Sequence, residues 1–95
     1  MGSVAETICD QIGRKALYMI GAKNLLAGEN SLSFRIRGSR KYNGIRIKLN
    51  GLDLYDMTFL KIHGSKVTEV EVSNVYNDQM LSVIEEHTGL YTRLF

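Results

Sequence analysis

The sequence predicts an α+β domain, a two-layer sandwich with an N-terminal helix, an antiparallel meander of four or five strands, and a C-terminal helix. Apolar residues recur at helical spacing near both ends of the chain, whereas they alternate with polar residues in the middle. Short runs rich in Gly, Asn or Asp separate the alternating segments, as is typical of turns between strands. The 95 residues contain no proline and no long Gly/Ser stretch, so we expect a single domain over residues 1–95.

The first helix is expected to run from residue 3 to about residue 14. Its apolar side chains fall at helical spacing and would share one face: Val4, Ala5, Ile8, Cys9 and Ile12. Ser3 is a candidate N-cap, and Glu6 three residues later completes a capping box. Gly13 is expected to end this helix.

The first half of the meander is expected to contain three strands. The first is placed at Leu17–Ile20, and its continuation toward Leu26 stays open. A turn at Ala27–Asn30 then leads into a strand at residues 32–37, where Leu, Phe and Ile alternate with Ser and Arg. Residues 45–49 alternate in the same way and form the next strand.

The second half of the meander adds two strands and leads into the last helix. Strands are expected from Leu54 to Ile62 and from Lys66 to Val72, and the turn before the first of them starts at Asn50-Gly51. The helix is expected from about Asn74 to Thr88. Its apolar face would contain Tyr76, Met80, Val83, Ile84 and His87. Ser73 is the candidate N-cap and Gly89 the left-handed C-cap. Both helices would then cover one face of the meander.

Charge is distributed very unevenly along the chain. The segment from Ser31 to Asn50 contains six basic residues and no acidic residue. These basic residues are Arg35, Arg37, Arg40, Lys41, Arg46 and Lys48. The rest of the chain holds the other six basic residues and all ten acidic residues, so a net charge of +2 divides into +6 and −4. Such an asymmetry indicates a surface that meets an anionic partner.

The register of this basic hairpin is predicted from Asn43-Gly44, a dipeptide typical of two-residue hairpin turns. In that register Lys41 lies opposite Arg46, and Tyr42 lies opposite Ile45. The face away from the apolar residues would then carry Arg35, Arg37, Lys41, Arg46 and Lys48. Like charges opposite each other destabilise a ladder, so other strands must neutralise these cations or a ligand must need them.

Four interpretations of the basic hairpin are open at this stage. It could bind an acidic protein, or it could contact a nucleic-acid backbone while Tyr42 at its tip stacks on a base. No fingerprint of a nucleic-acid-binding fold accompanies the charge. The basic hairpin could also meet the acidic remainder of a second copy in a homodimer. Alternatively, Asp56, Glu69 and Glu71 share the face with the cations and neutralise them.

The sequence does not point to an enzyme, a metal site or a cofactor. His63 and His87 have no zinc-binding spacing, and Asp53 and Asp56 would point to opposite faces of a strand. Cys9 is the only cysteine and is expected to be a small apolar helix residue. No apolar run is long enough to cross a membrane, and the N-terminus does not have the pattern of a signal peptide. We therefore expect a cytoplasmic protein that does not contact a membrane.

Much of the chain follows a pattern known from other proteins. The matching segments are YMIGAKN (18–24), NSLSF (30–34), IRIKLN (45–50), DLYDMTF (53–59), VYNDQML (75–81) and TGLY (88–91). In these segments the chain resembles a widespread family of short uncharacterised proteins from phages, prophages and plasmids. The resemblance spans about residues 13–92, and the chain has Ile20 and Leu25 where the family has Thr and Phe.

The resemblance implies a mobile-element origin in a bacterial host, and no activity comes with it. The polar positions that it shares are Lys23, Asn24, Asn50, Asp53 and Asp56. Asn and Asp suit turns because they bond to nearby backbone groups and tolerate unusual backbone angles. A turn does not require lysine, so Lys23 is a further candidate contact residue.

These observations together predict a small accessory protein that acts by binding an acidic macromolecule. The candidate contact residues are Arg35, Arg37, Arg40, Lys41, Tyr42, Arg46, Lys48 and Lys23. A host or defence protein is the favoured partner. Non-specific nucleic-acid binding is the alternative, and a homo-oligomer with a charge-compensated sheet is the second alternative.

Overall fold

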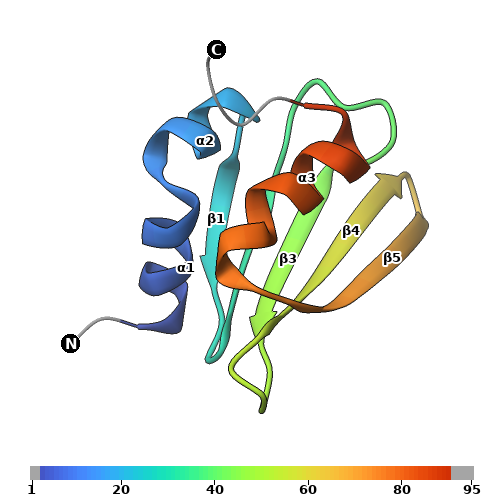
Figure 1. The fold of residues 1–95 in the computed structure, drawn as a ribbon. Helices are drawn as coiled ribbons and strands as arrows, with labels where there is room; N and C mark the ends of the chain where they lie inside the picture. Colours follow the sequence, from blue (N-terminus) through green and yellow to red (C-terminus); the bar gives the residue numbers. More distant parts are fainter. Residues whose placement is uncertain (1–2, 91–95) are drawn as a thin grey trace.

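Figure 1 shows a computed structural model of the chain, which describes residues 3–90. Tyr91, the last residue of the TGLY segment, lies outside the described residues. The helices are α1 (Val4–Ile12), α2 (Arg14–Met19), the 3-10 helix η1 (Asn77–Gln79) and α3 (Met80–Thr88). The strands are β1 (Lys23–Ala27), β2 (Ser31–Arg35), β3 (Gly44–Leu49), β4 (Tyr55–His63) and β5 (Lys66–Val75). The predicted α+β class is confirmed.

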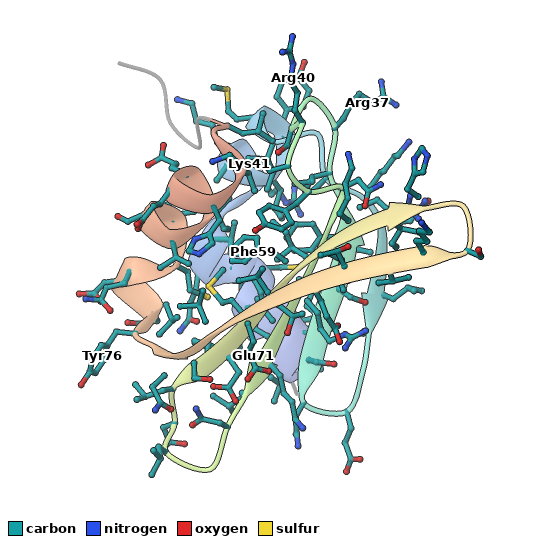
Figure 2. The ribbon with its side chains drawn as sticks, turned by 90° about the vertical axis from the view of Figure 1, so that its right-hand side faces the viewer. Arg37, Arg40, Lys41, Phe59, Glu71 and Tyr76 are labelled. Carbon is teal, nitrogen blue, oxygen red and sulfur yellow. The ribbon has the colours of Figure 1, made fainter. Side chains whose placement is uncertain are left out.

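The five strands form one antiparallel sheet in the order β1-β2-β3-β4-β5, so β1 and β5 are its edges. The helices lie against one face of this sheet, which we call the inner face (Figure 1). The opposite, outer face carries no helix (Figure 2). Buried side chains of the inner face are Leu32, Phe34, Ile45, Ile47, Tyr55, Met57 and Phe59. They form one core with Ile8 of α1 and Ile84 of α3, because an amphipathic sheet must bury its apolar face.

Helix α1 begins and ends where the sequence predicts. The Oγ of Ser3 accepts a hydrogen bond from the Glu6 amide at 3.1 Å and so satisfies one free N–H of the first turn. Gly13 has φ 89° and donates its N–H to the Cys9 carbonyl. Ala5, Ile8 and Ile12 form the buried stripe of the helix.

The strand predicted at Leu17–Ile20 is wrong, because these residues form the end of α2 and its C-cap. Ala16 and Ile20 are buried, whereas Tyr18 between them is 85% exposed; a strand would place all three on one face, but a helix does not. The α2 sequence RKALYM also consists mainly of residues with high helix propensity. Gly21, with φ 67°, then turns the chain, and β1 begins at Lys23.

The last helix begins later than predicted. Asn74 lies within β5 in the left-handed region, with φ 58°, and donates its N–H to Oδ1 of Asp56 at 3.1 Å. This bond holds the chain against β4, so Ser73 is a strand residue and does not cap a helix. Tyr76, predicted on the apolar face of the helix, lies before η1 and is 57% exposed.

The end of α3 agrees with the sequence. Gly89 has φ 74° and donates its N–H to the Glu85 carbonyl, which makes it the left-handed C-cap that was predicted. Met80 and Ile84 are fully buried on the side of α3 that faces the core.

The predicted register of β2 and β3 is wrong. Arg46 lies opposite Ser33 and Ile45 lies opposite Phe34, whereas the predicted partners were Lys41 and Tyr42. Residues 36–43 form a loop instead of two strand ends and a tight turn. The partner of Arg46 moves from position 41 to position 33, an even shift, so the side chains within β2 and β3 keep their predicted faces. Arg37 and Lys41, which were predicted on the outer face with them, lie in the loop instead.

Asn43 is the physical reason for the longer loop. Its side-chain amide donates to the Ile62 carbonyl at 2.7 Å, and its Oδ1 accepts from the Ile62 N–H at 2.8 Å. Its backbone N–H donates to the Leu60 carbonyl, and its carbonyl accepts from Ile36 N–H. Asn43 is therefore paired with β4 on one side and with the end of β2 on the other, so it is not available as the first residue of a two-residue turn.

Candidate binding surface

The outer face of the sheet carries the exposed basic residues of β2 and β3. Arg35, Arg46 and Lys48, which we call the strand cations, are all exposed. The ladder places Arg35 opposite Gly44, Arg46 opposite Ser33 and Lys48 opposite Ser31, so each cation faces a small neighbour. Among residues 3–90, no carboxylate forms an ion pair with a strand cation. The structure thus brings these three candidate residues together with their charges open to solvent.

Lys23 joins the strand cations at the β1 edge. It is exposed and lies directly opposite Arg35 in the β1–β2 ladder. Two like charges at opposed positions destabilise a sheet. Neither the ladder nor a turn requires a cation here, so Lys23 and Arg35 are the positions where a partner would relieve the most repulsion.

The acidic residues of β4 and β5 share this face. Lys48 lies opposite Asp56, Thr58 lies between Arg46 and Glu71, and Gly44 and Leu60 lie between Arg35 and Glu69. With strands about 4.8 Å apart, these cation–acid pairs are separated by roughly 5, 10 and 14 Å in the sheet plane. Salt attenuates the interaction between charges that are farther apart than the Debye length, which is about 10 Å at 0.1 M salt. The acids therefore lower the positive potential strongly at Lys48 and weakly at Arg35.

The nearest acid, Asp56, is already engaged by other groups. Its Oδ1 accepts hydrogen bonds from Asn50 Nδ2 and from the Asn74 amide, both at 3.1 Å. Oδ1 of Asn50 in turn accepts hydrogen bonds from the Leu52 and Leu54 amides and so closes the β3–β4 turn. Asn50 and Asp56 therefore serve the backbone of this turn.

Asn24 and Asp53 also have a structural role. Both lie in the left-handed region, with φ 56° and φ 60°. Asn and Asp adopt this region more readily than other residues with a side chain, as the sequence predicted. Asn24 lies where the β1–β2 register shifts, and Asp53 lies in the turn before β4.

One acid lies within the basic part of the face. Glu29 lines a hollow of about 380 Å³ together with Arg46 and Lys48. It belongs to the exposed turn between β1 and β2. Glu29 therefore reduces the positive potential at the Lys48 end of the strand cations and leaves the Arg35 end unaffected.

The remaining basic residues lie in the loop of residues 36–43. Arg37, Arg40 and Lys41, the loop cations, are exposed at one end of the molecule (Figure 2). The Arg37 N–H donates to the Ile20 carbonyl at the end of α2. Ser39 Oγ donates to the carbonyl of Thr88, the last residue of α3, at 2.8 Å. Cations near helix C-termini are favourable, which gives the loop cations a structural reason of their own.

Tyr42 does not lie at a hairpin tip. It is half-buried, and its ring packs against Phe59 with centroids 5.5 Å apart. His87 stacks on Phe59 at 4.6 Å. Phe59 points to the inner face, so Tyr42 belongs to the core side of the sheet and cannot stack on a nucleotide base at the outer face.

A shallow apolar depression lies beside the strand cations and was not predicted. It measures about 330 Å³ on the outer face. Its outer-face lining residues are Asn24, Leu26, Ser33, Arg35, Gly44, Arg46, Leu60 and Ile62. Gly44 begins β3 and has no side chain to fill the space between Arg35 and Leu60. The Asn43-Gly44 pattern predicts a turn, so no local signal in the sequence indicated this depression.

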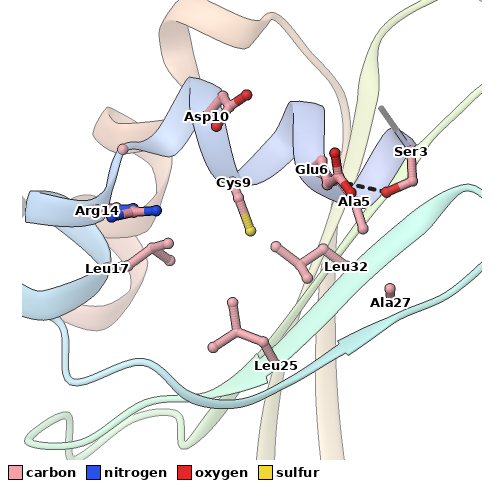
Figure 3. A pocket seen from close by; sticks show the side chains of 11 residues that line it. Ser3, Ala5, Glu6, Cys9, Asp10, Arg14, Leu17, Leu25, Ala27 and Leu32 are labelled. Carbon is pink, nitrogen blue, oxygen red and sulfur yellow. Dashed lines mark hydrogen bonds between the residues drawn. The ribbon is translucent and has the colours of Figure 1, made fainter. Parts of the chain in front are cut away.

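A larger cavity of about 670 Å³ lies between α1, α2 and β1. Figure 3 shows the Cys9 thiol pointing into it, toward Leu17, Leu25 and Leu32. Burial raises the pKa of this thiol, and the carboxylates of Asp10 and Glu6 raise it further. A raised pKa lowers the thiolate fraction at neutral pH, so this environment does not activate Cys9 as a nucleophile.

Asp56, His63 and Lys23 do not share one site. Asp56 and His63 lie near opposite ends of β4, seven residues or roughly 23 Å apart. Lys23 is three strands away from β4. Within residues 3–90 no three His, Cys, Asp or Glu side chains are grouped so that they could hold a metal ion. None of the helices in this range is long and apolar enough to span a membrane.

We also compared the chain with known proteins. No protein-family model, no curated protein and no solved structure matches it.

Proposed function

We propose that this protein is a non-enzymatic accessory protein that binds an acidic macromolecule through the strand cations and Lys23. The observation that carries the proposal is the group of exposed, unpaired cations on a sheet face that no helix covers. The opposed pair of Lys23 and Arg35 weakens the ladder, and an anionic partner would offset that cost. The resemblance to phage and plasmid proteins supports a bacterial host as the setting.

An acidic protein surface is the favoured partner. Asp56, Glu69 and Glu71 lie on the same face as the cations, and a nucleic-acid backbone crossing this face would be repelled by them. A protein surface can place acids against the cations and neutral or basic groups against the acids. The position of Tyr42 against Phe59 also removes the aromatic group that base stacking would use.

The test uses two double variants with the same net charge. Arg46→Glu with Lys48→Glu reverses two strand cations, and Lys15→Glu with Lys66→Glu reverses two exposed lysines outside this group. Each pair changes the formal charge from +2 to −2. Tagged proteins would be used to capture partners from a bacterial lysate at low and high salt, after circular dichroism has confirmed that each variant folds.

The expected result is an acidic protein that the unmodified chain and the lysine control retain at low salt. The Arg46/Lys48 variant and high salt should both release it, because the contact is electrostatic. If the variant with reversed strand cations captures the same proteins as its control, the proposal is wrong.

Nucleic acid is tested in parallel by fluorescence anisotropy with single- and double-stranded DNA and RNA at two salt concentrations. Binding that falls steeply with salt and disappears in the Arg46/Lys48 variant would favour the nucleic-acid alternative. The absence of binding at low salt would remove it.

A further inference from the structure

Arg35, the least screened of the strand cations, borders the depression at Gly44. Arg35 and Arg46 form one side of its rim, and Leu60 and Ile62 form the opposite wall. Leu26, which is 68% exposed, closes the depression at the β1 edge. Charge and apolar surface therefore meet at one place on the outer face.

We propose that the depression receives a large apolar side chain from an acidic peptide segment of the partner. This inference rests on the proposed function and specifies the chemistry of the partner. An apolar side chain would lie over Gly44 against Leu60 and Ile62, while acidic residues beside it would bond to Arg35 and Arg46. An arginine can hold a carboxylate through two parallel N–H bonds, which fixes the peptide in place.

The depression has room for a large apolar side chain. Its volume of about 330 Å³ is at the lower end of the range for small-molecule pockets, roughly 300–1,000 Å³. Charge complementarity gives the segment its direction across the sheet. Its acids lie over β2 and β3, because Glu69 and Glu71 on β5 would repel them.

Gly44 provides a steric test that leaves every charge in place. A Cβ at this position would lie 3.5 Å from Leu60 Cβ, an ordinary contact, and the backbone of Gly44 does not have a positive φ. Valine is favoured in strands, so Gly44→Val should fold while its methyl groups fill the depression. Leu60→Ser is a second variant, which removes the apolar wall instead.

The probe is an array of ten-residue peptides with fixed aspartates on both sides of a central position that takes all twenty residues. The fluorescently labelled protein should prefer Phe, Leu, Ile or Met at the centre over Ser by about 10-fold or more. Burial of such a side chain from water supports this magnitude. In Gly44→Val and Leu60→Ser the central preference should disappear, while weak binding to the aspartates remains.

The outcomes separate the inference from the proposed function. A central preference that Gly44→Val leaves intact, or no preference at all, overturns the inference, whereas loss of aspartate dependence would contradict the proposed function. If no peptide binds at low salt, the inference is overturned, and lysate capture still tests the function. A concentration-dependent dimer that Gly44→Val abolishes would show that a second copy fills the depression, which also overturns the inference.

Discussion

Replacing Asn43 and Gly44 one at a time tests the β2–β3 register on which the candidate surface depends. In the structure, Asn43→Ala removes two side-chain hydrogen bonds to Ile62, of 2.7 and 2.8 Å, and leaves a half-buried N–H and C=O without those partners. Gly44→Ala adds a methyl group in ordinary contact with Leu60. The two substitutions should therefore have very different effects.

The magnitude for Asn43→Ala follows from the two bonds. Each net hydrogen bond contributes about 0.5–1.5 kcal/mol, and Ile62 is only partly buried, so the expected loss in free energy of unfolding is about 2 kcal/mol. In a domain of this size such a loss lowers Tm by roughly 8–16 °C. Gly44→Ala should leave stability unchanged or raise it by about 0.4–1 kcal/mol, because alanine restricts the unfolded chain.

Thermal unfolding followed by circular dichroism measures both effects. Amide hydrogen exchange at Ile62 should accelerate in Asn43→Ala and stay unchanged in Gly44→Ala. A two-residue Asn43-Gly44 turn predicts the opposite order, because the glycine would then need a positive φ and alanine would be costly. If Gly44→Ala is the more destabilising change, the register described here is wrong.

Three further predictions concern other parts of the chain. Ser39→Ala should lower the free energy of unfolding by about 1–2 kcal/mol, because Ser39 Oγ bonds to the Thr88 carbonyl and to the amides of Lys41 and Tyr42. Chemical denaturation measures this loss, and Ser82→Ala at an exposed position is the control, with an expected change near zero. Asp53→Gly should be neutral or stabilising and Asp53→Val should cost about 1–2 kcal/mol in the same assay, because φ is 60° at this position; equal costs would contradict the left-handed conformation. Alkylation of Cys9 by iodoacetamide should be slow at neutral pH, with a pH midpoint above that of an unstructured cysteine peptide, because a raised pKa shifts thiolate formation to higher pH. A midpoint at or below that of the peptide would contradict the burial of the thiol.

The outer face could be predicted from the sequence because side-chain alternation in a strand has a period of two. Leu32 and Phe34 had to point inward, so Ser33 and Arg35 had to point outward, and the same argument holds for Arg46 and Lys48. Alternation determines a register only to within an even shift, however. The true partner of Arg46 depends on the bonds between Asn43 and Ile62, which join residues nineteen positions apart.

Long-range contacts also explain the errors at the ends of elements. Leu17–Ile20 is a short apolar run whose local pattern suits either a helix or a strand. The exposure of Tyr18 between the buried Ala16 and Ile20 decides in favour of the helix, because a strand would place all three on one face. Asn74 stays in β5 because Asp56, eighteen residues earlier, accepts its N–H. The depression at Gly44 requires the neighbours Arg35 and Leu60, which only the correct register identifies.

The odd number of strands makes the two edges of the sheet inequivalent. In an antiparallel sheet, the residues whose side chains lie on one face form their backbone hydrogen bonds with one neighbouring strand. The residues whose side chains lie on the other face form theirs with the opposite neighbouring strand. At the free edge of β1, the N–H and C=O groups that have no neighbouring strand belong to inner-face residues such as Ala27. At the free edge of β5, these groups belong to the outer-face residues Glu69 and Glu71. If a second copy paired its β1 with this β5 in antiparallel fashion, the helices of the two copies would lie on opposite faces of the joined sheet. Pairing of β5 with itself would bring these acids together, so both ways of joining a second copy to the β5 edge are obstructed.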